Sequence, residues 1–448
     1  MSEQYYDEYE NREDLLEARR LRRLELKRKR MIQQRIIIAV LAVVLILGII
    51  VLLNSCDGTE ETVEKDQEEQ IVIPEDETPD VPEDPVVEPD KIVSLAAVGD
   101  IMIYDDQIAD AEQEDGTYDF SSCFSAISAY TLSSDLTVGN LELNFLGAPY
   151  TGRANAVTFF NAPESLATTL NKIGFDVLQT ANTYSITNGM NGLESTIQYL
   201  NEAGIDHVGT YVTNPAESAD KGVLIREVNG VRIAFLGFTK GLNGFSLPTT
   251  REYCVDLLYT DYTSNYKSIN STGILDRIDA AKSLNPDVII AMVHWGSEFD
   301  LEVSESQKDI TNLMFKNGVD VILGSHSHIV GPMEKKTVET VDGETKECFV
   351  AYSLGNFVAS MTKDYANESV ILNLEFTKSG ETGKTTISDI RYTPLYFADH
   401  GVTADNRFEI LPIRNALEAG LFESIRPQME KALDNLKTHT NSLYDSGK

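Results

Sequence analysis

Cysteine and histidine are scarce in this chain of 448 residues, which holds four cysteines and six histidines. The cysteines, at positions 56, 123, 254 and 348, lie far apart and show none of the paired spacings of zinc fingers. If the globular part is exported, one disulfide remains open, but the sequence does not choose its partners. We expect Cys123 and Cys348 to be buried thiols rather than a bridge.

Positive charge is also in short supply, with 37 basic against 71 acidic side chains and a net charge of −34. A protein that binds nucleic acid needs a basic face to neutralise phosphates. The composition therefore argues against a nucleic-acid partner. Hydrophobic residues make up 42% of the chain, which is typical of a globular protein with a sizeable core.

A long apolar run lies near the amino terminus. Residues 36–53, IIIAVLAVVLILGIIVLL, carry no polar side chain and follow the strongly basic residues 19–35. About 20 apolar residues cross a bilayer as a helix, and flanking basic residues favour the cytoplasmic side. We predict a cytoplasmic tail (1–35), a transmembrane helix (36–53) and an exported remainder, which makes this a single-pass protein of the cell membrane. The alternative is a cleaved lipoprotein signal with lipid on Cys56.

Residues 54–90 are predicted to form a linker. Residues 57–90 hold fifteen acids, one lysine and five prolines. Their few apolar side chains cannot offset the entropy lost on ordering, so we expect a charged, extended spacer between membrane and folded domain.

In residues 91–448, apolar runs of strand length alternate with helical patterns. Strands are expected at 91–100, 175–182, 231–239, 286–296, 319–328, 368–377 and 385–397, and helices at 189–204, 274–285, 306–318 and 414–436. Continuous Val, Ile and Leu runs separated by helices indicate parallel or mixed strands that are buried on both faces. The sequence therefore predicts an α/β domain.

Polar side chains stand at the carboxyl ends of these runs. They are Asp100, Asn182, His294, His326 and His328, and the pattern extends to Asn140 and Glu142. Loops at the carboxyl ends of parallel strands gather side chains into sites. This mixed nitrogen and oxygen set suits a divalent transition metal. Any one of these residues alone would more often be a hydrogen-bonded loop residue, and Asp100 also fits a helix N-cap.

Six stretches resemble a known family in the same order, over about residues 92–360. They are AAVGDIM, LTVGNLE, FFNAPESLATTLNKIGFDVLQTANTYSITNGMNGLESTIQYLNEAGI, VHWGSEF, VDVILGSHSHIVGPME and YSLGNFV. The resemblance is to the CapA-like proteins of poly-γ-glutamate capsule synthesis, which are related to calcineurin-like metallophosphoesterases. It implies a metallophosphatase-like, four-layer α/β/β/α sandwich at residues 91–448, with two divalent metal ions (manganese, zinc or iron).

The resemblance also implies roles for individual residues. Asp100 and His328 would bind the first metal, Asn182, His294 and His326 the second, and Glu142 would bridge the two. Asn140 is a further site residue that could orient Glu142. Glu298, close behind His294, is a candidate partner for that histidine.

Departures from the family pattern concern proton transfer more than metal binding. The family sequence Ala-Asn-Asn-His, two residues, Asp, any residue, Gly is changed here at Thr183, Tyr184 and Thr187. Tyr184 replaces the histidine thought to protonate the leaving group, so Tyr184 and His294 are the candidate catalytic residues. A tyrosine with an ordinary pKa of about 10 is a poor proton donor at neutral pH unless its surroundings lower that value. Ser325 and Ser327 replace His and Pro.

We therefore expect a membrane-anchored component of capsule or cell-surface polymer biosynthesis, with an extracellular metal site of weak hydrolytic competence. Its expected partners are the membrane, membrane-bound polymer synthase subunits and an anionic surface polymer. Residues 91–448 carry 26 basic and 48 acidic side chains, a net charge of −22, which repels a polyanion unless metal ions or a local basic patch intervene. The alternatives are a non-catalytic metal-binding scaffold and an extracellular metallophosphodiesterase that uses Tyr184 as its acid.

Overall fold

The computed structural model describes residues 88–147, 160–404, 406–440 and 444–446. They belong to a compact unit that begins at Glu88. The predicted tail, the predicted transmembrane helix (36–53) and nearly all of the predicted linker lie outside the described residues, as does Cys56. Within the described ranges, no helix combines the length and the apolar character needed to cross a membrane.

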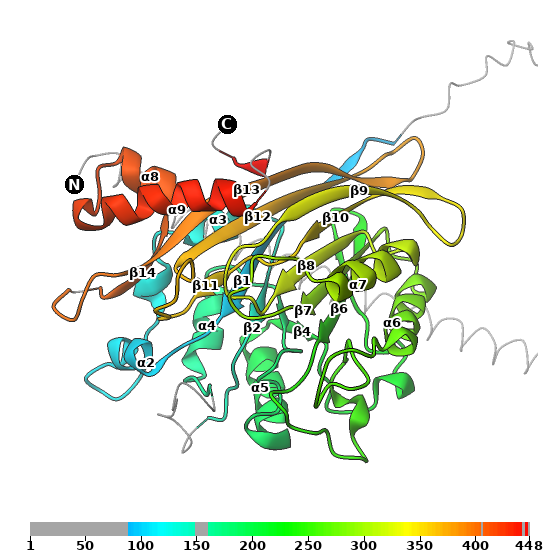
Figure 1. Cartoon of the computed structure of the whole chain (residues 1–448), viewed down its shortest axis with the longest axis horizontal. Coiled ribbons are helices and arrows are strands. Elements are labelled where there is room, and N and C mark those ends of the chain that lie inside the picture. The colour runs from blue at the N-terminus through cyan, green and yellow to red at the C-terminus, as the bar shows by residue number, and fades with distance from the viewer. Residues whose placement is uncertain (1–87, 148–159, 405, 441–443, 447–448) are drawn as a thin grey trace, which may run out of the picture. The chain divides into compact units, whose positions relative to one another are not determined.

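The first of two β-sheets has eight strands in the order β14-β13-β12-β1-β2-β3-β4, with β11 paired to β1 (Figure 1). Its strands are β1 (Lys91–Ile101), β2 (Leu136–Leu141), β3 (Val177–Gln179), β4 (Asp206–Val208), β11 (Asn356–Val358), β12 (Glu368–Lys378), β13 (Thr385–Asp399) and β14 (Phe408–Pro412). Strands β1 to β4 run parallel to one another, and β12 to β14 are antiparallel. The sheet is therefore mixed.

The second sheet has six strands in the order β5-β6-β7-β8-β10-β9. Its strands are β5 (Leu224–Val228), β6 (Val231–Thr239), β7 (Val288–His294), β8 (Val321–Ser325), β9 (Met333–Glu339) and β10 (Thr345–Ala351). The central strands β6, β7, β8 and β10 are parallel. Both sheets therefore have a group of parallel strands whose carboxyl ends can supply a site.

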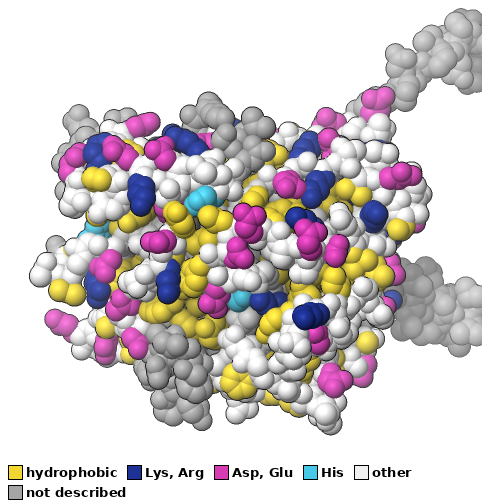
Figure 2. Space-filling view, viewed as in Figure 1, with side chains coloured by type: hydrophobic (Ala, Val, Ile, Leu, Met, Phe, Trp, Pro, Cys, Tyr) yellow, Lys and Arg dark blue, Asp and Glu magenta, His cyan; other side chains and the backbone are white. Residues whose placement is uncertain are grey.

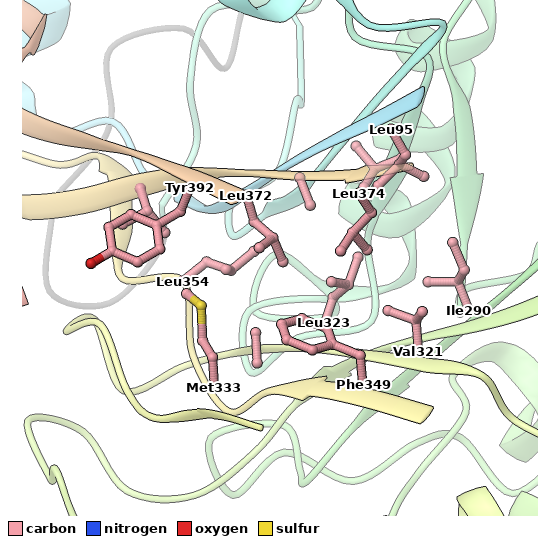
Figure 3. Packing of buried hydrophobic residues seen from close by; sticks show 14 of the residues in the cluster. Leu95, Ile290, Val321, Leu323, Met333, Phe349, Leu354, Leu372, Leu374 and Tyr392 are labelled. Atoms are coloured by element: carbon pink, nitrogen blue, oxygen red, sulfur yellow. The ribbon is translucent and has the colours of Figure 1, made fainter. Parts of the chain in front are cut away.

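The inner faces of the two sheets share one apolar core. Leu95 and Leu374 of the first sheet point toward Ile290, Val321 and Leu323 of the second (Figure 3). Successive residues of a strand point to opposite faces, so Ala96 and Val98 of β1 belong to a different cluster, on the outer face of the sheet. This alternation explains why the runs expected from sequence are apolar throughout, because both faces of these strands are buried.

Helices cover the outer face of each sheet. They are α2 (Asp105–Ala111), α3 (Ser128–Ser133), α4 (Ser165–Lys172) and α5 (Gly189–Ala203) with the first sheet, and α6 (Ser271–Ser283) and α7 (Glu305–Lys316) with the second. The apolar residues of α6 and α7, such as Ile278 and Met314, pack on the outer side chains of β6 and β7. The architecture is thus a mixed α/β sandwich with two sheets, and the helices expected from sequence at 189–204, 274–285 and 306–318 are confirmed.

The expectation of one final helix over residues 414–436 is wrong. The segment contains two α-helices, α8 (Ile413–Glu418) and α9 (Arg426–His439), and a short 3₁₀ helix (Glu423–Ile425) before α9. Between them Gly420 and Phe422 adopt positive φ angles of 64° and 56°, which interrupts the helical backbone. Pro427 lies in the first turn of α9, where its missing N–H costs no hydrogen bond.

The three cysteines in the described region, Cys123, Cys254 and Cys348, are buried and free. The expectation that Cys123 and Cys348 are buried thiols is confirmed. Neither cysteine forms a disulfide bond. The stability of the sandwich therefore depends on its apolar cores.

A buried carboxyl group connects α9 to the first sheet. Glu368, the first residue of β12, accepts a hydrogen bond at Oε1 from Asn435 Nδ2 of α9 (2.6 Å). Its Oε2 is buried without a hydrogen-bond partner in the described structure. Burial raises the pKa of Glu368 to about 7, although Asn435 and Lys431 oppose the rise. The neutral form of Glu368 is therefore the one that the folded state favours.

We predict that the Glu368→Gln variant is more stable than the wild type at pH 8, by about 1 kcal/mol. The raised pKa means that the stabilising contribution of Glu368 is complete below about pH 4.3, where the unfolded carboxyl titrates, and is lost as the pH rises to about 7. Urea denaturation at pH 4.5 and pH 8 measures this difference. Glu381→Gln, in an exposed turn, is the matched control, and an unchanged pH dependence in Glu368→Gln would contradict the assignment.

Candidate metal centre

The polar residues singled out from the sequence meet where the parallel strands of the two sheets end. In the first sheet Asp100 on β1 is in register with Asn140 on β2 and with Asn356 on β11. In the second sheet His294, the last residue of β7, is in register with Ser325, the last residue of β8. The ends of both sheets therefore contribute side chains to one buried place.

Two glycines permit the close backbone approach that this meeting requires. A Cβ atom on Gly99 would lie 1.8 Å from the carbonyl oxygen of Gly355, and one on Gly324 would lie 2.0 Å from that of Tyr352. No side chain fits at either position. Because Gly99 precedes Asp100 and Gly324 precedes Ser325, the glycines lie directly beside the site residues. Asp100 N–H then donates to Gly355 O at 2.9 Å.

The two histidines of the GSHSH stretch follow β8 in an unusual backbone conformation. His326 and His328 have φ angles of 91° and 59°, which costs a residue other than glycine roughly 1–3 kcal/mol. Both side chains are buried, and their ring centroids are 6.0 Å apart. The ring of His326 also lies 4.5 Å from that of His294. The conformation thus brings both histidines, although only one residue separates them, into the same site as His294.

Contacts between buried polar groups join the two sheets, and three of them involve the carboxylates of Asp100 and Glu142. The carboxylate of Asp100 lies 3.1 Å from His328 Nδ1, and the carboxylate of Glu142 lies 3.2 Å from His294 Nε2. The backbone N–H of His326 also donates to Asp100 Oδ2 at 3.3 Å. Each carboxylate of the first sheet is therefore paired with an imidazole of the second.

The side chains form overlapping groups that could hold metal ions. One ligand atom from each of Asp100, Glu142 and His328 lies within 4.8 Å of the others, and the same holds for Glu142, His294 and His326. Glu142 belongs to both groups, which is the arrangement that the family resemblance implied for a bridging carboxylate. A third group joins His326 and His328 to the exposed Glu298.

The electrostatics of His326 also fit a metal ligand. Burial and the positive charges of His294, Lys240 and His328 hold its pKa well below the usual range. The imidazole is therefore neutral, as a metal ligand must be. Its Nδ1 is buried and has no hydrogen-bond partner in the described part of the chain. A neutral imidazole with an unpartnered nitrogen, in one ligand group with Glu142 and in another with Glu298, matches a divalent transition metal.

Without a metal, a charged pair balances the site. Burial alone would lower the pKa of His328, but the carboxylates of Glu142 and Asp100 outweigh it and raise that pKa to about 9. Burial acts in the opposite direction on Asp100, where His328 and His294 outweigh it and lower the pKa. The imidazolium of His328 and the carboxylate of Asp100 therefore neutralise each other. A metal ion would displace the proton from His328.

The two asparagines have different surroundings. Asn140 Nδ2 donates to Asp100 Oδ1 at 2.7 Å and lies 3.4 Å from Glu142 Oε2, so Asn140 orients both carboxylates. The side chain of Asn182 bonds to backbone groups, with Nδ2 donating to Leu141 O at 2.7 Å and Oδ1 accepting from Tyr184 N–H at 2.9 Å. Asn182 thus fixes the loop after β3, and its role as a metal ligand stays a prediction.

Three further residues touch the histidines of the site and were not assigned from the sequence. Thr183 Oγ1 lies 3.3 Å from His294 Nε2, Ser325 Oγ lies 3.1 Å from His294 Nδ1, and Asn356 Oδ1 lies 3.0 Å from His328 Nδ1. Asn356, within the YSLGNFV stretch, is the first residue of the short strand β11. The rule that selected Asp100, a polar residue at the carboxyl end of an apolar strand, does not find it.

The surroundings of Tyr184 make it a weaker acid than an ordinary tyrosine. Burial, followed by the negative charges of Glu142 and Glu298, raises its pKa further above the usual value. The ring packs edge-on against Phe160 with a centroid distance of 4.7 Å. Thr187, where the family has Asp, has a buried hydroxyl without a partner in the described residues. The condition under which Tyr184 could donate a proton at neutral pH is therefore absent.

Glu298 was expected beside His294. Its carboxylate lies with His326 and His328 instead, and no hydrogen bond or ion pair with His294 is present among the described residues. Glu298 is exposed, whereas the other acids of the cluster are fully buried. It thus marks the side of the cluster that faces solvent.

Comparison with known proteins gives consistent matches. Residues 94–361 match the family described as bacterial capsule synthesis protein PGA_cap. A capsule biosynthesis protein CapA from Bacillus anthracis is 27% identical over 303 residues, which is 66% of each chain. A PGA biosynthesis protein CapA from Bacillus subtilis is 25% identical over 303 residues, or 67% of this chain and 72% of the relative. The match therefore spans just under two thirds of the first relative's length.

Solved structures have a lower sequence identity to this chain. A putative 5′-nucleotidase from Staphylococcus aureus has 13% identity and a TM-score of 0.41, over 76% of this chain and 58% of its own. A calcineurin-like phosphoesterase from Bacillus subtilis has 17% identity and a TM-score of 0.38, over 68% of this chain and 91% of its own. Both TM-scores are below 0.5.

We predict that the His326→Ala variant of the full-length chain binds Mn²⁺ at least about tenfold more weakly than the wild type. The substitution removes an imidazole that belongs to two of the potential ligand groups, one with Glu142 and one with Glu298. Isothermal titration calorimetry in detergent solution measures the affinity, and His439→Gln at the end of α9 is the control. Equal Mn²⁺ affinity in the wild type and in His326→Ala would show that the cluster is not a metal site.

Proposed function

The chain belongs to the bacterial capsule synthesis protein family PGA_cap, and we propose that it is a membrane-anchored component of cell-surface polymer production. In this proposal the polymer is of the poly-γ-glutamate type, and a divalent metal centre in the folded domain faces the outside of the cell. The family match and the names of the two Bacillus relatives support the role in capsule synthesis. The apolar segment 36–53 behind a basic tail supports the anchor.

The observation that carries the proposed metal centre is the position of Glu142 in both buried groups of ligand atoms. Asp100 and His328 would hold one divalent ion, His294 and His326 a second, with Glu142 between them. Such ions act as Lewis acids that polarise the oxygen atoms of a bound group. The hydrogen bonds of Asn140 and Thr183 keep the carboxylate of Glu142 in place. The mixed set of donors fits manganese, zinc or iron.

The proposed site is better suited to binding and orienting a ligand than to transferring protons. A general acid contributes about 10²–10⁴-fold to a hydrolytic rate, and Tyr184 keeps its proton because of burial and nearby carboxylates. We therefore propose that contact with the polymer or its precursor, rather than fast hydrolysis, is the main task of the metal centre.

The charge of the folded domain restricts how an anionic polymer can approach. The net charge of residues 91–448 is −22, and acidic and basic side chains are interspersed on the face shown in Figure 2. A polyanion would be repelled over most of such a surface. We propose that contact is confined to the metal centre, where cations reverse the local charge, and that synthase subunits in the membrane present the polymer there.

Polymer production in cells tests this proposal. In a host whose surface polymer depends on this chain, the His294→Ala variant should reduce the polymer on the cell surface at least about tenfold, because one of the two groups loses one of its two imidazoles. The polymer is measured after release from washed cells, with the amount of the chain in the membrane determined in parallel. His439→Gln is the matched control.

Normal polymer production by His294→Ala would contradict a role for the metal centre. If that variant also retains its place in the membrane, the result would favour the alternative of a non-catalytic scaffold. The scaffold alternative requires the folded domain but not the side chains that would bind the metal ions.

A second candidate function, an extracellular metallophosphodiesterase, is favoured by the full set of buried carboxylates and imidazoles. We predict that the wild type hydrolyses a generic phosphodiester slowly and that the double variant Tyr184→His, Thr187→Asp is faster by about 10²–10⁴-fold. The variant restores the residues of the family pattern and thereby a group that titrates near neutral pH. Tyr184→Phe is the control. Fast hydrolysis by the wild type that Tyr184→Phe abolishes would contradict this view and make Tyr184 the acid.

A further inference from the structure

Lys240 is an unusual cation beside the candidate metal centre. It follows β6 directly, and its backbone N–H donates to the carbonyl oxygen of His294 at 2.8 Å. Its side chain turns inward, where Nζ donates to Gly296 O and lies 4.6 Å from the centroid of the Tyr266 ring. These contacts hold the ammonium group in place next to the loop of His294 and Glu298. Neither contact neutralises its charge.

Lys240 is the one described lysine that is neither exposed nor paired with a carboxylate. The lysines with a carboxylate partner are Lys282, Lys308, Lys335, Lys336, Lys346, Lys378, Lys384 and Lys437. The remaining lysines of the described ranges are exposed, whereas Lys240 is half-buried. In a domain with such an excess of acids, a partly buried ammonium without an acid partner is unexpected, since buried charges are normally paired.

The charge of Lys240 acts on the site itself. The positive charge of Lys240 helps to lower the pKa of His326. The negative charge of Glu298 in turn favours the charged form of Lys240. Glu298 also forms a potential ligand group with His326 and His328. A divalent ion in that group would take up the negative charge of Glu298. Lys240 would then have no acid left to balance it.

We propose that Lys240 binds an oxyanion of the substrate, a carboxylate or phosphate oxygen, at the solvent-facing side of the metal centre. This inference rests on the proposed function and adds the chemical class of the ligand. An ammonium group is a compact charge without the fixed fork of a guanidinium, so it accepts either kind of oxyanion. One such cation beside the metal ions gives local attraction in a domain that repels polyanions elsewhere.

Anion binding by the full-length, Mn²⁺-loaded chain in detergent solution tests the proposal. Two probes, inorganic phosphate and the dipeptide γ-glutamyl-glutamate, are titrated separately by calorimetry, and Mn²⁺ binding is followed by electron paramagnetic resonance. The variants are Lys240→Gln, which can still donate to Gly296 O, and Lys240→Arg, which keeps the charge. Thermal unfolding of each variant checks that it is folded.

The control is Lys363→Gln. The ammonium of Lys363 is exposed and lies 5.7 Å from the ring of Phe299, which in turn lies 5.8 Å from the ring of His328. Lys363 therefore adds positive charge on the same side of the cluster without being held against the site. It separates a specific contact from a general effect of charge.

We expect Lys240→Gln to bind at least one probe about 10- to 100-fold more weakly than the wild type, as for a lost hydrogen bond between charged groups. Mn²⁺ should bind equally well or more tightly, because a positive charge near His326 is removed. Lys240→Arg should retain most of the anion affinity, and Lys363→Gln should change it less than about twofold. The probe whose binding depends on Lys240 identifies the source of the oxyanion.

Three results would overturn the inference. They are the absence of binding of both probes to the Mn²⁺-loaded wild type, equal affinities in the wild type and Lys240→Gln, and equal losses in Lys240→Gln and Lys363→Gln. In each of these cases Mn²⁺ still binds, so the proposed metal centre survives. A wild-type chain that binds no Mn²⁺ would instead contradict the proposed function and the inference together.

Discussion

The contacts between carboxylates of one sheet and imidazoles of the other are the constraint on which the site depends. Asp100 and Glu142 are completely buried, and burying a carboxylate is costly unless a partner compensates its charge. The compensating groups, His328 and His294, arrive from the second sheet. Removal of one partner from such a pair leaves an uncompensated buried charge and typically costs about 3–5 kcal/mol. The packing of the two sheets and the chemistry of their strand ends are thus coupled.

Local patterns predicted the strands and the position of most site residues. The apolar runs before Asp100, His294 and His326 are strands, and their carboxyl ends do converge. The contact of Asn356 with His328 depends on the short strand β11 pairing with β1, some 250 residues earlier in the chain. Such pairing follows from the order of strands in the sheet, which no local periodicity contains. The prediction of a single final helix was wrong for a different reason. The apolar spacing of the sequence continues across the break at Gly420.

The residues of the cluster separate two tasks that metal-dependent hydrolases combine. The groups that could hold ions are all present and buried, and a shared carboxylate lies between them. Tyr184 and Thr187 stand at the two positions where the family pattern has residues for proton transfer, a histidine and an aspartate. Thr183 and Ser325, which also differ, contact His294 and so support a ligand instead. Relative to the family pattern, the substitutions thus remove acid–base capacity, while the side chains of the potential ligand groups keep their polar contacts.

The backbone after β8 has a consequence for anyone who would make this domain sturdier. Glycine would relieve the left-handed conformation at positions 326 and 328. At position 328 it would also remove the imidazole that compensates the buried carboxylate of Asp100, and that loss of about 3–5 kcal/mol exceeds the roughly 1–3 kcal/mol of relieved strain. The ring nitrogen Nδ1 of His326 has no hydrogen-bond partner among the described residues, so at position 326 glycine would gain stability at the expense of an imidazole. Thermostability and the proposed ion binding therefore compete at position 326 and agree at position 328.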